Sequence, residues 1–188
     1  MTGFASRLSY IADLMKSLHQ PRILRGIDEA IRVILTAVND RKPLLVCGNG
    51  GSASDALHIS GELVGRFLIE RRAIDVVCLN ANVSVLTAWS NDYDYASVFA
   101  RQVEAHGRAG GVLWGLSTSG NSPNVVAAFE AAQSMGMKTV ALTGEGGGRL
   151  AAVADVLIDV PSRETPRIQE LHLPIYHFIC EAIEQGAR

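Results

Sequence analysis

The sequence has little charge of either sign, few cysteines and no long apolar run. Its 188 residues include 17 Lys and Arg against 19 Asp and Glu, a net charge of −2, which argues against a nucleic-acid-binding protein. No segment approaches the roughly 18 apolar residues that a membrane span needs. The three cysteines, Cys47, Cys78 and Cys180, are an odd number inside apolar stretches. We therefore interpret them as buried hydrophobic residues, not as a disulfide framework or a zinc knuckle.

The length and composition fit one globular domain. Hydrophobic residues make up 48% of the chain, enough for a sizeable core, and no linker, internal repeat or low-complexity tract interrupts it. Residues 1–7 lack the basic-then-apolar layout of a signal peptide, so we expect a cytoplasmic protein. We predict a single domain over 1–188, in which leading helices within 1–40 precede an α/β core over 41–188.

Short apolar runs alternate with helical segments after residue 40. The runs cover 44–47, 74–79, 112–116, 139–142 and 156–160, and the helical segments cover 54–65, 83–90, 95–106, 123–136 and about 166–185. Continuous apolar strands separated by helices are typical of a parallel sheet covered on both faces. The sequence therefore predicts a three-layer, doubly wound sandwich around a five-stranded parallel sheet. The two leading helices carry apolar residues on more than one face, which favours packing against copies of themselves in an oligomer over mere padding of the sandwich.

A glycine-rich loop follows the first apolar run. Asn49, Gly50, Gly51 and Ser52 stand between a strand and a helix, where backbone N–H groups can approach an anion closely. A plain glycine turn is the alternative. The segment also satisfies the dinucleotide pattern, but the next strand ends in 78–82 without the carboxylate that would hold a ribose. No Gly-Lys-Ser/Thr occurs, which excludes a Walker loop.

A second loop is richer in hydroxyl groups. Ser117, Thr118, Ser119 and Ser122 precede Pro123, which occupies the first position of a predicted helix. One of these hydroxyls would suffice as a helix cap, and four together favour binding of a phosphate without any lysine.

These motifs carry a family resemblance. The stretch 117–122 resembles the phosphosugar-binding motif of the sugar isomerase (SIS) domain. Together with 48–52, 91–93 and 167–170 it resembles the phosphoheptose isomerase branch, over nearly the whole chain. The resemblance implies conversion of sedoheptulose 7-phosphate to D-glycero-D-manno-heptose 7-phosphate, the first step towards nucleotide-activated heptoses, in a homotetramer.

The resemblance also implies the site residues. It assigns one Zn²⁺ to His58, Glu62, Gln169 and His177, and proton transfer to Glu62 and His177. His58 and Glu62 lie four apart on one helix and point the same way, whereas on spacing alone they would be interpreted as a solvated pair. Gln169 and His177 lie about 12 Å apart along a helix axis, so spacing alone would not have suggested their sharing an ion. The predicted substrate contacts are Asn49, Gly50, Gly51, Ser52, Glu62, Asn91, Asp92, Ser117, Thr118, Ser119, Ser122 and Gln169.

Two further interpretations remain open at this point. A relative with the same fold is a non-catalytic tetramer that associates with the bacterial replication initiator, but it lacks the histidine corresponding to His177. Thr165, just before Pro166, is a candidate cap of the last helix, and Pro166 stands where some relatives have an aspartate that contacts the sugar.

Overall fold

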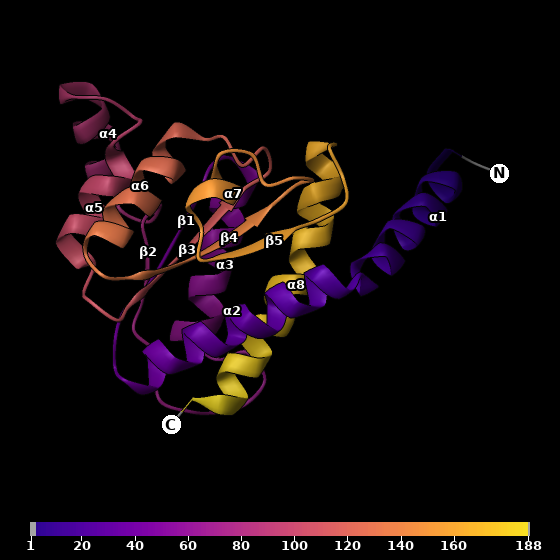
Figure 1. Ribbon diagram of the computed structural model, residues 1–188, viewed down its shortest axis with the longest axis horizontal. Coiled ribbons are helices and arrows are strands. Elements are labelled where there is room, and N and C mark those ends of the chain that lie inside the picture. Colours follow the sequence, from indigo (N-terminus) through magenta and orange to yellow (C-terminus); the bar gives the residue numbers. More distant parts are fainter. Residues whose placement is uncertain (1–2, 188) are drawn as a thin grey trace.

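The computed structural model describes residues 3–187, and a five-stranded parallel sheet forms its centre (Figure 1). The strands are β1 (Leu44–Gly48), β2 (Val76–Cys78), β3 (Val112–Ser117), β4 (Lys138–Thr143) and β5 (Val156–Asp159). They lie in the order β2-β1-β3-β4-β5, and every neighbouring pair is parallel. The predicted five-stranded parallel sheet is confirmed.

The helices fall close to their predicted positions. They are α1 (Gly3–Lys16), α2 (Pro21–Asn39), α3 (Gly51–Val64), α4 (Val83–Asp92), α5 (Val98–His106), α6 (Pro123–Ser134), α7 (Leu150–Val153) and α8 (Thr165–Gly186). The short α7 and the 3₁₀ turn η1 (Ser17–His19) were not predicted. The expectation that Thr165 caps the last helix is wrong, because Thr165 is the first residue of α8 and Glu164 occupies the capping position.

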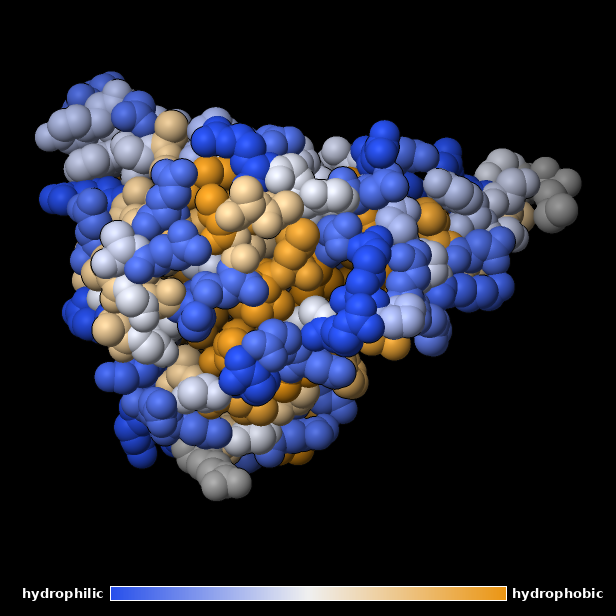
Figure 2. Space-filling model, viewed as in Figure 1, coloured by the Kyte–Doolittle hydropathy of each residue, from blue (hydrophilic) through white to orange (hydrophobic). Residues whose placement is uncertain are grey.

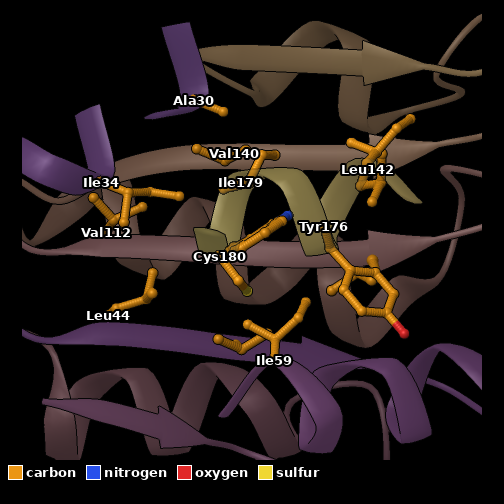
Figure 3. Close-up of a cluster of buried hydrophobic side chains, with 14 of the residues drawn as sticks. Ala30, Ile34, Leu44, Ile59, Val112, Val140, Leu142, Tyr176, Ile179 and Cys180 are labelled. Atoms are coloured by element: carbon orange, nitrogen blue, oxygen red, sulfur yellow. The ribbon is translucent and has the colours of Figure 1, made fainter. Parts of the chain in front are cut away.

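Alternate residues of the strands face two separate cores. Leu44 and Val46 belong to the cluster beneath α2, α3 and α8, whereas Leu45 and Cys47 belong to the cluster beneath α5 and α6. Figure 3 shows the first cluster, where Ile59 of α3 and Ile179 of α8 lie over the sheet. A sheet buried on both faces explains why its strands are continuously apolar instead of alternating.

Helix α1 extends away from the body of the molecule (Figure 1). None of its described residues is buried, and the side chains of Phe4 and Leu8 are 75% and 55% exposed. On the face of the molecule that Figure 2 shows, hydrophobic residues are visible at the surface among the hydrophilic ones. No helix within residues 3–187 is long and apolar enough to cross a membrane.

The strand order reverses between two inner strands of the sheet, β1 and β3. From β1 the chain moves outward to β2, whereas from β3 it moves the opposite way to β4 and β5. The loops after β1 and β3 therefore diverge at a topological switch point, where ligands of open α/β sheets bind. The glycine-rich loop and the hydroxyl-rich loop are these two loops, since β1 and β3 pair with Gly48 opposite Leu116.

Candidate functional site

Two asparagines join the loops at the switch point. Asn49 donates to Oδ1 of Asn124 at 2.8 Å, and Asn124 donates back to Oδ1 of Asn49 at 2.9 Å. The hydroxyl of Tyr95 donates to the same oxygen of Asn49 at 2.8 Å. These three residues line a small cavity of about 190 Å³ together with Ser122. The side chain of Asn49, predicted to contact substrate, is thus already held in place by protein partners.

The glycines of the first loop meet two different requirements. Gly50 has φ of +56°, a backbone conformation that residues with a Cβ rarely adopt. A Cβ at Gly51 would collide with the side-chain amide of Gln169, which comes from α8. The loop therefore brings the start of α3 against Gln169, and both belong to the predicted substrate contacts.

Some hydroxyl side chains of the second loop are buried. Ser117 is 3% exposed, and its Oγ lies 2.9 Å from Oγ of Ser122. Ser122 occupies the capping position of α6, yet its side chain makes no capping hydrogen bond. Ser52, at the start of α3, is also buried. Ser52 and Ser122 lie at the beginnings of α3 and α6, where the helix dipole favours an anion, and Ser117 ends β3 beside Ser122.

Charged residues lie beside the second loop. Thr118 and Ser119 line a cavity of about 200 Å³ with Glu145 and Arg163, which form an ion pair of 2.6 Å between Nε and Oε2. The Oγ of Ser119 accepts a hydrogen bond from the backbone N–H of Asn121. Sequence reasoning missed this ion pair, because it comes from loops far from the motif along the chain.

Helices α3 and α8 bring together a second group of predicted residues. Nε2 of His58 lies 2.9 Å from Oε1 of Glu62, and Nδ1 of His58 lies 3.0 Å from the hydroxyl of Tyr176. That hydroxyl also contacts Oδ1 of Asp55 at 3.4 Å. The ring of His177 packs edge-on against the ring of His58, with centroids 5.1 Å apart. His58, Glu62 and His177 therefore form one cluster.

His177 is the member of this cluster with an unused nitrogen. Its Nε2 is buried and has no hydrogen-bond partner among the described residues. Burial and the neighbouring His58 lower the pKa of His177, and the carboxylate of Glu62 opposes them in part. The imidazole is therefore neutral near pH 7, with one nitrogen able to accept a proton or bind a metal ion.

A buried carboxylate fixes the loop that lies beside this cluster. Glu184 accepts hydrogen bonds from the backbone N–H groups of Phe67, Leu68 and Ile69 at 2.6 to 3.0 Å. Arg71 lies 3.6 Å from Glu184 and donates to the backbone carbonyl of Glu62 at 2.9 Å. The loop after α3 is thereby tied to α8, and the ring of Phe67 packs against the ring of His177 at 5.4 Å.

Other predicted site residues lie outside these groups. Asn91 and Asp92 end α4, are exposed and hydrogen-bond to one another at 2.9 Å. Asp92 lines a separate cavity of about 390 Å³ with Trp89, Tyr93 and Arg101. Within residues 3–187, no group of three or more His, Cys, Asp or Glu side chains is arranged as it would be around a metal ion.

Sequence reasoning also missed several partners of the site. Asn124 and Tyr95 hold the first loop, Tyr176 contacts His58, and Asp55 in turn accepts from Tyr176. No helical spacing predicts the contact between Asp55 and Tyr176, because these residues lie 121 positions apart. No local signal links Asn49 to Asn124 either, because they are 75 positions apart and meet only through strand order.

Comparisons with known proteins agree with this arrangement. The SIS domain family model matches residues 8–144. A phosphoheptose isomerase of Citrifermentans bemidjiense is 46% identical over 180 residues, covering 96% of this chain and 93% of its own. One from Helicobacter pylori is 46% identical over 166 residues, covering 86% of both chains. The solved structure of the phosphoheptose isomerase from Neisseria gonorrhoeae superimposes with a TM-score of 0.91 at 38% identity, covering 97% of both chains.

The fold and the two hydroxyl-bearing loops define a phosphosugar-binding α/β domain, and the chain belongs to the SIS domain family. Within that family, relatives that are 38 to 46% identical to the chain and cover 86 to 97% of it are phosphoheptose isomerases. The branch predicted from the four motifs is confirmed.

Proposed function

We propose that the chain converts sedoheptulose 7-phosphate to D-glycero-D-manno-heptose 7-phosphate through an enediol, as the first step towards nucleotide-activated heptoses. The observation that carries this proposal is the cluster of His58, Glu62 and His177 on two packed helices. Aldose–ketose isomerisation needs a base and an acid close together, and this cluster offers a carboxylate beside a neutral imidazole. The phosphoheptose isomerases among its relatives support the same reaction.

The phosphate of the substrate would bind at the loops after β1 and β3. Ser52, Ser117, Ser119 and Ser122 supply hydroxyl donors, and the starts of α3 and α6 supply backbone N–H groups. Thr118, Gly50 and Gly51 belong to the same loops. Asn91 and Asp92 remain proposed sugar contacts, and their place at the end of α4 separates them from the Asn49–Asn124 pair.

Glu62 and His177 would move the protons. Glu62 takes a proton from carbon 1 of the ketose and delivers it to carbon 2. His177 transfers the proton that leaves the oxygen of carbon 1 to the oxygen of carbon 2. Both side chains are partly buried, which strengthens hydrogen bonds to a bound substrate. The reaction involves no net gain or loss of protons, because the proton lost at one carbon is regained at the next.

The chemistry of the donor set suits a zinc ion, although the described side chains are not arranged around one. Two imidazoles and a carboxylate are ligands that zinc prefers, and the unpartnered, buried Nε2 of His177 is one such ligand atom. His58, Glu62 and His177 would hold the ion, with Gln169, two turns earlier on α8, as the fourth ligand. When bound, zinc would polarise the substrate carbonyl as a Lewis acid. Rigorous chelation should lower activity and added zinc should restore it; full activity without metal would refute the zinc proposal and leave Glu62 and His177 to act alone.

The homotetramer expected from the family would bury the exposed face of α1. Phe4, Leu8 and Tyr10 are exposed on this helix, and Leu24 and Phe178 are exposed where α2 and α8 line a groove with Leu18. Burying such side chains stabilises association by about 25 cal/mol per Å². Light scattering should give the mass of four chains, and a stable monomer at micromolar concentration would contradict the proposal.

The direct test of the function is incubation of zinc-loaded protein with sedoheptulose 7-phosphate, followed by separation and identification of the product. Formation of the heptose 7-phosphate supports the proposal. Recovery of unchanged substrate would refute it.

A further inference from the structure

Tyr176 stands between the two histidines of the cluster. Its side chain is only 1% exposed, and Figure 3 shows its hydroxyl directed away from the surrounding hydrophobic side chains. Its ring packs edge-on against both His58 and His177, with centroids 5.5 Å and 5.0 Å away. A buried phenol normally finds a hydrogen-bond partner, and this one has two, Nδ1 of His58 at 3.0 Å and Oδ1 of Asp55 at 3.4 Å.

The proposed zinc ion gives this row of groups a direction. Carboxylates only accept hydrogen bonds, and two of them flank the row, Glu62 at Nε2 of His58 and Asp55 at the Tyr176 hydroxyl, so without a metal ion either nitrogen can carry the imidazole proton. A zinc ion bound at Nε2 leaves that proton on Nδ1, and the proton of the Tyr176 hydroxyl then points to Asp55. The phenol oxygen is then an acceptor for Nδ1–H of His58. An imidazole that carries its proton on Nδ1 presents a lone pair at Nε2, and Nε2 of His58 faces Glu62. Each donor in the row from His58 through Tyr176 to Asp55 then has an acceptor.

We propose that Tyr176, itself held by Asp55, is a positioning residue that accepts the Nδ1 proton of His58 and thereby fixes Nε2 as the metal-binding atom. This inference rests on the zinc ion proposed above. A histidine that binds a metal commonly donates its other ring N–H to an outer partner, which fixes its tautomer and orientation. Here the partner is a phenol, and the carboxylate lies one group further out.

The test compares zinc affinity across three variants. Tyr176→Phe keeps the ring and removes the acceptor, and it should weaken zinc binding about 10- to 100-fold, the range for loss of an outer partner. Asp55→Asn keeps an acceptor for the phenol and should weaken zinc binding by less than Tyr176→Phe does. Tyr10→Phe is the matched control, because it removes an exposed hydroxyl contact to Glu164, the residue that precedes α8, and should leave zinc affinity unchanged. Affinity is measured by competition with a chromogenic chelator.

A spectroscopic readout separates positioning from loss of structure. In zinc-loaded protein labelled with ¹⁵N-histidine, the Nδ1–H signal of His58 should be protected from solvent exchange. In Tyr176→Phe it should exchange faster, while the circular dichroism spectrum stays unchanged. If Tyr176→Phe does not fold, Asp55→Asn replaces it in the test. Asp55→Asn should then bind zinc more weakly than the wild type and show faster exchange of the same proton.

The outcomes distinguish this inference from the proposed function. Wild-type zinc affinity in a folded Tyr176→Phe protein overturns the inference, and so does a wild-type protein that isomerises substrate without binding zinc. A wild-type protein that binds zinc but does not convert sedoheptulose 7-phosphate refutes the function alone. Weaker zinc binding in Tyr176→Phe, with Tyr10→Phe unchanged, supports the positioning role.

Discussion

Asn49 and Asn124 exchange a pair of side-chain hydrogen bonds, of 2.8 and 2.9 Å, across the point where the chain reverses its direction of winding. Asn124 is buried on α6, and Asn49 belongs to the loop before α3. The pair therefore fixes the spacing between the two helix starts that we propose to hold the phosphate.

Asn124→Ala should raise the Michaelis constant for the sugar phosphate by about tenfold, because Asn49 would lose one of its two partners. It should also lower the free energy of unfolding by about 1 to 3 kcal/mol, the cost of a buried polar group left unpaired. Gln133→Ala is the control, since it removes one hydrogen bond to the backbone of Val153 on the exposed side of α6. An unchanged Michaelis constant in Asn124→Ala would contradict the role of the pair.

Ser122→Ala should separate substrate binding from helix capping. The side chain of Ser122 makes no capping bond, but its Oγ pairs with the buried Oγ of Ser117. Its loss should therefore lower the free energy of unfolding by about 1 to 3 kcal/mol and also raise the Michaelis constant steeply. Asn82→Ala removes a true cap, since Asn82 accepts from the N–H of Val85 at 3.1 Å. It should cost about 1 kcal/mol with little effect on substrate binding. Kinetics and urea unfolding of both variants provide the check, and an unchanged Michaelis constant in Ser122→Ala would remove Ser122 from the phosphate site.

Glu62→Gln should lower turnover by about 10² to 10⁴, the usual loss when a general base is removed. Glutamine preserves the size of the side chain and can still hydrogen-bond to His58, so the fold should persist. Glu104→Gln, an exposed carboxylate paired with Arg101, should leave turnover unchanged. Near-normal turnover of Glu62→Gln in a steady-state assay would exclude Glu62 as the base.

His172 should make the protein less stable as the pH falls below neutrality. Burial lowers its pKa from 6.5 to about 4, and the hydrogen bond to the carbonyl of Thr143 only partly opposes this. Between these two values the unfolded chain binds a proton that the native chain does not, so the free energy of unfolding decreases on acidification by up to about 1.4 kcal/mol per pH unit.

His172→Gln removes that contribution, so its free energy of unfolding should decrease less than that of the wild type between pH 6.5 and 4.5. Urea unfolding at several pH values measures the difference, and carboxylates affect both proteins alike. Parallel curves would show that His172 does not titrate on unfolding.

The strands could be predicted because burial on both faces leaves a plain signal. The run 112–116 is apolar at every position except Gly115, and the structure places a strand over Val112–Ser117. Helix ends were harder to predict. Helix α3 begins at Gly51, three residues before the predicted start, because Gly50 takes up a left-handed conformation and Gly51 makes room for Gln169. The four-residue α7 is too short for periodicity to reveal it.

The site was predicted only as far as motifs and helical spacing reach. His58 and Glu62 share one helix face, so their contact follows from the sequence. The approach of His177 and Tyr176 depends on how α8 packs beside α3, which no local pattern encodes. The same holds for the anchoring of Phe67 by Glu184, because these residues lie 117 positions apart.

We propose that Glu62 and His177 carry out an enediol isomerisation of a heptose 7-phosphate. Proton NMR of sedoheptulose 7-phosphate with zinc-loaded protein in D₂O tests it most directly, because a proton released to a side chain exchanges with solvent before it returns. We predict that signals of the aldose heptose 7-phosphate appear with deuterium at carbon 2, and that Glu62→Gln abolishes them. A spectrum without the aldose, or an aldose that carries only the hydrogen transferred from carbon 1 at its carbon 2, would contradict this mechanism.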